Sequence, residues 1–143
     1  MSKEKLHLLL LEAFLRSNRR LSQQLPQAGL LPGQPKILEF LLEHNASTQK
    51  AVSEGCFLDK STVTTLLKRM EKDRKDSLIY KQPHPTDQRS SLICLTEKGK
   101  EKALWVQQSL NAIDETEFAS IPSAEREQFL ATLGKIIANQ KKW

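Results

Sequence analysis

Apolar residues in most of this chain recur every three or four positions, which is the spacing of one buried face of an α-helix. The pattern predicts helices over residues 2–24, 35–44, 48–55 and 60–73. A run of prolines and glycines follows the first of these, so we expect that helix to end before Pro26. The helical period returns after Gly99 in two further helices, the second of which begins at Ser123.

A strand-like pattern interrupts the helices over residues 78–82 and 90–95, where apolar and polar side chains mix. We expect Ile79, Tyr80 and Cys94 to be among the buried positions of these strands. The residues between them, PHPTD, include two prolines and predict a stiff polar loop. The fold class expected is therefore mainly α-helical, with one small β-hairpin that has an extended tip.

The helix predicted over residues 60–73 has two chemically different faces. Val63, Leu66, Leu67 and Met70 share one face, because successive residues are turned by about 100°. The opposite face and its flanks carry hydroxyls and two cations: Ser61, Thr62, Thr64, Thr65, Lys68 and Arg69. Such groups hydrogen-bond both phosphates and base edges. A short helix, a tight turn and a second helix with this face predict a helix-turn-helix, although an ordinary solvated face is the alternative.

Basic charge is concentrated in the same part of the chain. The net charge is +5, and residues 59–102 alone carry +4, from 11 basic and 7 acidic residues. A basic hairpin directly after a helix-turn-helix is a wing, and an arginine at its tip can enter the minor groove of DNA. We expect Asp87 to hold Arg89 in one orientation at this tip; a plain surface ion pair is the alternative.

Two apolar stripes lie near the ends of the chain, over residues 6–21 and 129–137. Hydrophobic residues make up 38% of the chain and aromatic residues only 6%, which indicates a modest core. The stripes exceed what a small winged domain can cover. We therefore expect them to pack against a second copy of the chain.

Three segments follow one another in a characteristic order: LLPGQPKILEFLLEH, TQKAVSEGCFLDKSTVTTLLKRMEK and DQRSSLICLTEKGKE. The most specific parts are LDKSTVTTLLKRME (residues 58–71) and the D-x-R…L-T-x-K-G run (residues 87–99). Their order resembles the MarR family of winged helix-turn-helix transcriptional regulators. The resemblance implies a single MarR-like domain over residues 1–143, with a DNA-binding lobe at about 34–100. Residues 1–30 and 101–143 would form a helical dimerisation lobe. It also implies a homodimer on a pseudo-palindromic double-stranded operator. Such regulators are most often repressors, released by a small phenolic, aromatic or lipophilic effector or by cysteine oxidation.

On this interpretation the DNA contacts come from the helix-turn-helix and the wing tip. They are Gln49, Lys60, Ser61, Thr62, Thr64, Thr65, Lys68, Arg69, Asp87 and Arg89. The resemblance also places an effector pocket between the dimerising helices and the winged domain. Its expected walls are Phe14, Ile37, Leu41 and Trp105.

The chain departs from the family pattern at two places. Phe57 stands where the family often has glycine in the turn of the helix-turn-helix, which we interpret as a local repacking. The link over residues 73–77 is a few residues longer than usual and lacks glycine, so the position of the wing against the preceding helix stays open.

Cys56 and Cys94 lie in apolar surroundings and are more typical of core residues than of oxidant sensors, although sensing is left open. Redox members of the family usually carry the reactive cysteine in the first helix, where this chain has none. The three histidines have no ligand spacing, so we expect no metal in the chain itself; a site shared across a dimer is left open.

Several motifs typical of enzymes and membrane proteins are missing from the sequence. There is no nucleophile beside a base and no glycine-rich phosphate loop, so we expect neither a cofactor nor enzymatic activity. The apolar start is too short to span a bilayer, which favours a cytoplasmic protein without a membrane partner. The alternative to a DNA-binding regulator is a winged-helix module for protein–protein contact, because fold alone does not exclude it. The operator, the effector and the sign of regulation are not encoded in any of these patterns.

Overall fold

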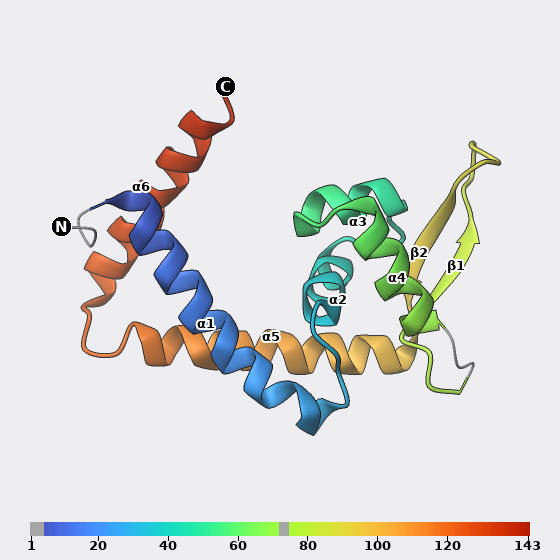
Figure 1. Ribbon diagram of the computed structural model, residues 1–143, viewed down its shortest axis with the longest axis horizontal. Helices are drawn as coiled ribbons and strands as arrows, with labels where there is room; N and C mark the ends of the chain where they lie inside the picture. The colour runs from blue at the N-terminus through green and yellow to red at the C-terminus, as the bar shows by residue number, and fades with distance from the viewer. Residues whose placement is uncertain (1–4, 72–74) are drawn as a thin grey trace. The chain divides into compact units, whose positions relative to one another are not determined.

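The computed structural model describes residues 5–71 and 75–143 and confirms a mainly helical fold with one antiparallel β-hairpin (Figure 1). Its elements are α1 (Leu6–Ala28), α2 (Gln34–Glu43), α3 (Gln49–Cys56), α4 (Lys60–Glu71), β1 (Ile79–Pro83), β2 (Ser91–Leu95), α5 (Glu97–Glu117) and α6 (Ser123–Gln140). By internal contacts the chain divides into two compact units, Met1–Leu110 and Asn111–Trp143. No helix within the described ranges is long and apolar enough to cross a membrane.

The first helix ends later than its sequence predicts, because Pro26 lies inside α1. A proline there removes one hydrogen bond near the end of the helix. Leu25 and Ala28 hold the last turn in place, since both are buried in the core. The helix stops at Gly29, which adopts the left-handed conformation with φ 68° and donates its N–H to the carbonyl of Pro26.

The core of the first unit lies among α2, α3, α4 and the hairpin. Helix α2 contacts α3 and β2, while α4 contacts α3 and β1. Ile37 and Leu41 of α2 are fully buried in this core. Val63, Leu67 and Met70 of α4 are buried as their helical spacing predicts, whereas Leu66 on the same predicted face is only half-buried. The opposite face of α4 is therefore left toward solvent.

The hairpin pairs Ile79 with Leu95 at its base and Pro83 with Ser91 near its tip. In Figure 1 its far end extends clear of the helices of the same unit. The expected burial of Tyr80 is wrong, because this side chain is 45% exposed. Neighbouring residues of a strand point to opposite faces, and Ile79 takes the inward position.

A short third strand-like contact joins the hairpin to the segment before α3. Ser47 and Ile93 exchange both backbone hydrogen bonds, at 3.1 and 2.7 Å. Asn45 Oδ1 accepts the N–H of Leu95 at 2.9 Å. Thr48, the residue after this bridge, caps α3 by accepting a backbone N–H at 3.1 Å. These contacts fix α3 against the base of the wing.

The second unit, Asn111–Trp143, exposes most of its apolar surface. Within it Phe118 and Phe129 pack edge to face, with ring centroids 6.3 Å apart. Arg126 bonds Glu115 at 2.7 Å and lies over the Phe118 ring. Helix α6 nevertheless contains no buried residue, and its apolar side chains Phe129, Leu130 and Ile137 are exposed.

Candidate nucleic-acid interface

The start of α4 is organised by a capping aspartate. Asp59 Oδ1 accepts the backbone N–H of Thr62 at 2.7 Å and the hydroxyl of Ser61 at 3.0 Å. These hydrogen bonds, above all those from Thr62, lower the pKa of the Asp59 carboxyl below its usual value. The cap orders the first turn of α4, where three of the residues expected to contact DNA lie: Lys60, Ser61 and Thr62.

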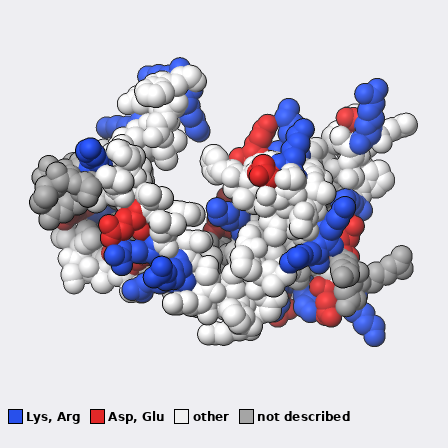
Figure 2. All heavy atoms as spheres, viewed as in Figure 1, with Lys and Arg blue, Asp and Glu red and all other residues white. Residues whose placement is uncertain are grey.

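The outward face of α4 presents the expected hydroxyls and cations. Ser61, Thr65 and Lys68 are exposed there, opposite the buried face. The Thr65 hydroxyl donates to the carbonyl of Ser61 at 3.0 Å, so its lone pairs remain available as acceptors. In Figure 2 basic side chains stand over the helix-turn-helix and the hairpin end, with acidic side chains among them. This surface can meet phosphates with its cations and base edges with its hydroxyls.

Two residues expected to contact DNA, Gln49 and Thr64, also bridge the helices of the helix-turn-helix. Gln49 Nε2 donates to Thr64 Oγ1 at 2.6 Å, and that hydroxyl donates to the carbonyl of Lys60 at 2.8 Å. Both side chains are half-buried. The bridge connects the first turn of α3 to α4 and sets the angle between them. Its two residues lie fifteen positions apart, which no local pattern reveals.

Arg69 lies on the flank of α4 that faces the α1–α2 turn. It lines an open hollow of about 630 Å³ together with Lys98 and Lys102 of α5. Asp76 adds an acidic group to the same hollow. Arg69 is exposed, so it can still approach a nucleic acid from the edge of the α4 face.

The wing tip is shaped by a histidine that the sequence pattern does not single out. His84 Nδ1 accepts the backbone N–H groups of Thr86 and Asp87, at 3.1 and 3.0 Å. The Asp87 carboxylate in turn accepts the backbone N–H of Arg89 at 2.9 Å and the Ser90 hydroxyl at 3.2 Å. Asp87 thus holds Arg89 through its backbone. No ion pair joins these two side chains among the described residues, so the Arg89 guanidinium extends toward solvent.

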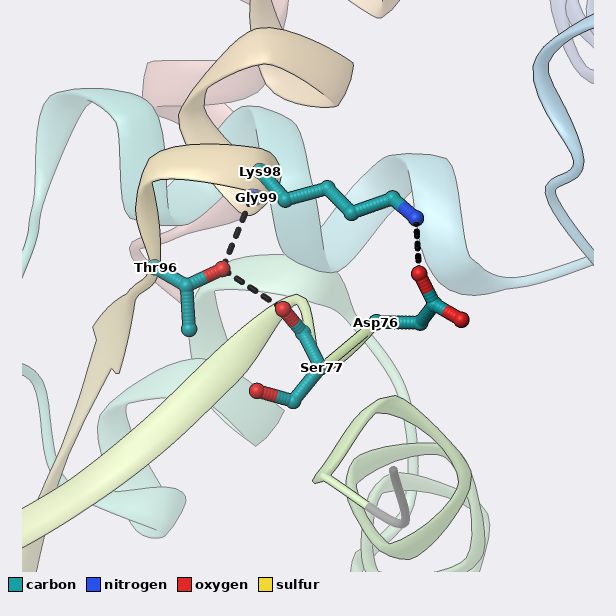
Figure 3. Close-up of polar contacts among 5 residues, drawn as sticks. All are labelled: Asp76, Ser77, Thr96, Lys98 and Gly99. Carbon is teal, nitrogen blue, oxygen red and sulfur yellow. Dashed lines mark hydrogen bonds and ion pairs between the residues drawn. The ribbon is translucent and has the colours of Figure 1, made fainter. Parts of the chain in front are cut away.

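The base of the wing is fastened to the start of α5 (Figure 3). Thr96 Oγ1 donates to the carbonyl of Ser77 at 2.7 Å and accepts the N–H of Gly99 at 2.9 Å. Lys98 Nζ bonds Asp76 Oδ1 at 2.6 Å on the same side. These contacts hold the two ends of the hairpin together.

The link between α4 and the wing, which the sequence leaves open, is closed by a backbone hydrogen bond. Leu78 donates its N–H to the carbonyl of Met70 at 2.8 Å. Asp73 and Arg74 of the link lie outside the described residues. The bond across the link ties the first strand directly to the end of α4.

Phe57 does not repack the turn between α3 and α4. Its side chain is 92% exposed, and its backbone adopts the left-handed conformation with φ 55° and ψ 40°. The interpretation of a local repacking is therefore wrong. The backbone alone performs the role that the usual glycine has in such a turn.

A small cavity lies among α1, α2 and α5 within the first unit. Its volume is about 250 Å³, and its walls are Phe14, Ser17, Asn18, Leu21, Pro35, Lys36, Glu39 and Leu110. Of the four expected walls only Phe14 lines this cavity. Ile37 and Leu41 are core residues with no exposed surface, and Trp105 is half-buried elsewhere on α5. Ile37 and Leu41 do not face this cavity, because the inward side of α2 packs on the core.

Cys56 has the character of a core thiol. It is 5% exposed, and its thiol donates to the carbonyl of Lys36 at 3.4 Å. Burial raises its pKa to about 11 and outweighs the opposing effect of Lys36. Cys94 is buried as well. Within the described ranges no group of three His, Cys, Asp or Glu residues is placed to hold a metal ion.

Comparison with known proteins assigns this architecture. The sequence model of the MarR family matches residues 28–90. The organic hydroperoxide resistance transcriptional regulator of Bacillus subtilis (strain 168) is 44% identical over 75 residues. That alignment covers 49% of this chain and 49% of the relative, so the chain matches about half of that regulator's length.

Solved structures extend the likeness over nearly the whole chain. A MarR-family transcriptional regulator from Silicibacter pomeroyi superposes with a TM-score of 0.85 at 24% identity, covering 97% of this chain and 92% of that one. Bordetella bronchiseptica BpsR, whose DNA binding is regulated by 6-hydroxynicotinic acid, superposes with a TM-score of 0.74 at 26% identity. It covers 90% of this chain and 95% of its own. The chain is therefore similar to the MarR family over residues 28–90, and it has the winged helix-turn-helix fold of these solved structures.

Proposed function

We propose that this protein is a dimeric, sequence-specific DNA-binding transcriptional regulator, a repressor that a small molecule releases from its operator. The observation that carries the proposal is the exposed hydroxyl and cation face of α4 beside a wing whose tip extends Arg89. A regulator of this kind acts on the chromosome, in the cytoplasm.

Each half of the interface has its own task in this proposal. Helix α4 lies in the major groove, with Ser61, Thr62, Thr65 and Arg69 nearest the bases and Lys60 and Lys68 nearer phosphates. Arg89 enters the adjacent minor groove, where A·T-rich sequence narrows the groove and deepens its negative potential. The backbone hydrogen bonds at the wing tip support this task, because they hold the arginine's attachment point in place before DNA arrives.

The dimer is proposed from the apolar residues left in solvent. In α1 these are Leu6, Leu9, Leu11, Phe14 and Leu15, and in α6 they are Phe129, Leu130 and Ile137. Exposed apolar surface of this extent marks an interaction site. A two-fold dimer would cover the same face on both copies and would place two α4 helices about one helical turn of DNA apart. Deleting residues 123–143 should give monomer or aggregate; a soluble truncation with unchanged DNA affinity would contradict the dimer.

The effector is proposed to be a small aromatic acid that occupies the cavity lined by Phe14 and Lys36. Phe14 gives the cavity an aromatic wall, and Lys36 Nζ lies 5.1 Å from the centre of that ring. This pairs an apolar surface for a ring with a cation for a carboxylate. The volume of about 250 Å³ suits a single-ring compound. Salicylate should lower operator affinity in the wild type and lose that effect in Lys36→Met, which keeps an unbranched side chain only one atom shorter but removes its charge.

A salt titration of DNA binding separates this function from a protein-interaction module. Electrophoretic shifts on the protein's own promoter region would be measured from about 50 to 200 mM salt. A dimer that makes about six phosphate contacts should lose roughly 1,000-fold in affinity over this range. Lys68→Ala should lower the slope by about two for the dimer, whereas Lys135→Ala, on α6, should leave it unchanged. Binding that ignores salt, or that does not distinguish the promoter from random DNA, would refute the proposal.

A further inference from the structure

The turn that precedes α4 holds an aromatic side chain in an unusual position. Phe57 is 92% exposed, far more than the other large apolar residues within the described part of the first unit. It also adopts the left-handed backbone conformation, with φ 55°. Bulky residues rarely occupy this region, because the β-carbon crowds the following carbonyl, and such strain gathers at functional positions.

The fold makes no use of the Phe57 ring. The C-cap of α3 is formed by backbone groups, since Phe57 donates its N–H to the carbonyl of Glu54 and Leu58 donates to that of Ser53. Glycine would make the same hydrogen bonds without strain. Because the Phe57 ring is exposed and its backbone is strained, phenylalanine should make the fold less stable than glycine would at this position.

The position of the ring points to nucleic acid as its partner. Phe57 lies two residues before Asp59, the cap of α4, in the turn from which α4 begins (Figure 1). The left-handed backbone turns the ring outward beside the first turn of the proposed recognition helix. Phenylalanine contacts DNA through apolar groups, and in the major groove the apolar group of a base edge is the thymine methyl.

We propose that Phe57 is a further DNA contact, which packs against a thymine methyl group at the edge of each half-site. This rests on the proposed DNA-binding function and adds an aromatic contact to thymine beside the hydroxyls and cations of the α4 face. The strain of the turn is retained because the contact needs a large apolar side chain there.

The test compares Phe57→Gly with Phe57→Asn, which tolerates the left-handed conformation without an apolar group. Leu31→Ala removes a 44% exposed leucine outside the interface and serves as the matched control. Affinities would be measured on the selected operator and on the same operator with uracil in place of thymine, which lacks only the methyl group. Melting temperatures would be measured in parallel.

Both Phe57 variants should melt no lower than the wild type. They should lose about 10-fold in operator affinity for each half-site, in the range of an aromatic base contact. Uracil should weaken wild-type binding by about 4-fold for each thymine methyl group removed, and should have no effect on Phe57→Gly. Unchanged affinity of Phe57→Gly, an equal uracil effect in both proteins, or a clear fall in its melting temperature would overturn the proposal while DNA binding by the wild type stands. Failure of the wild type to bind DNA would overturn it together with the proposed function.

Discussion

Gly99 is the position at which a single methyl group should damage the fold most directly. It lies in the first turn of α5, where the wing is fastened to that helix (Figure 3). A β-carbon built at Gly99 would stand 1.9 Å from the carbonyl oxygen of Leu78 and 2.9 Å from its carbonyl carbon. Ordinary contact begins near 3.4 Å, so the backbone of the wing base would have to move by about 1.5 Å.

The cost of Gly99→Ala follows from what that movement breaks. The Leu78 carbonyl accepts the N–H of Thr96 at 3.0 Å, and Thr96 Oγ1 accepts the N–H of Gly99 at 2.9 Å. Breaking these two hydrogen bonds costs about 2 kcal/mol, and overpacking adds about 1–3 kcal/mol. The better helix propensity of alanine returns about 1 kcal/mol. The free energy of unfolding should therefore fall by about 3 kcal/mol, a large part of the roughly 5–15 kcal/mol of a typical domain.

Urea unfolding followed by circular dichroism, at one fixed protein concentration, measures this change. Lys100→Ala is the control, because Lys100 is exposed on the next position of α5 and makes only a loose pair with Glu97 at 3.6 Å. It should stay within about 0.5 kcal/mol of the wild type. A Gly99→Ala protein within that same margin would show that the close approach of Leu78 does not constrain the wing base.

Three further predictions concern the wing tip, the cap of α4 and the buried thiol. His84→Ala should weaken operator binding and reduce the preference for A·T flanks. His84→Asn should keep the wild-type affinity and flank preference, because its side-chain oxygen can accept the same N–H groups. Equal losses in the two variants would contradict the positioning role of His84. The pKa of Asp59 is lower in the folded protein, so its cap stabilises the fold above the unfolded pKa and loses that effect as pH falls through the folded pKa. In urea titrations the stability advantage of the wild type over Asp59→Ala should therefore shrink in acid. An advantage that is constant with pH would contradict this prediction. With a pKa near 11, Cys56 should hold about 0.1% thiolate at pH 8. It should therefore resist alkylation in the native protein, as mass spectrometry would show. Because its pKa is raised on folding, the contribution of the Cys56 thiol to stability is present below the unfolded pKa and is lost as pH rises through about 11. Rapid alkylation of Cys56 at pH 8 would contradict this prediction and would favour an oxidant-sensing role for this thiol.

Local periodicity accounts for the parts of the fold that the sequence predicts well. The buried positions Val63, Leu67 and Met70 follow from helical spacing, and the hairpin follows from two strand-like runs around a proline-rich loop. The exposed face of α4 follows from the same spacing. These features depend on residues close together in the chain, so their pattern is visible without a structure.

The features that the sequence does not predict depend on contacts between residues far apart in the chain, or on whether packing outweighs a local preference. The bridge from Gln49 to Thr64 spans two helices, so a polar pattern alone reads both residues as surface groups. Packing of Leu25 and Ala28 outweighs the helix-breaking tendency of Pro26. The residues that line the cavity depend on how α1, α2 and α5 pack together: Ile37 and Leu41 are buried in the core, and Lys36 and Glu39 of α2 line the cavity instead.

The central claim is that α4 and Arg89 divide the reading of one two-fold operator between the grooves of DNA. Selection of bound sequences from a random DNA library, with the wild type and with Arg89→Ala, tests it most directly. The wild type should select a palindrome with half-sites about 10 base pairs apart, centre to centre, and A·T-rich flanks. Arg89→Ala should keep the central bases and lose the flank preference. Selection of no palindrome by the wild type, or of unchanged flanks by the variant, would contradict the account.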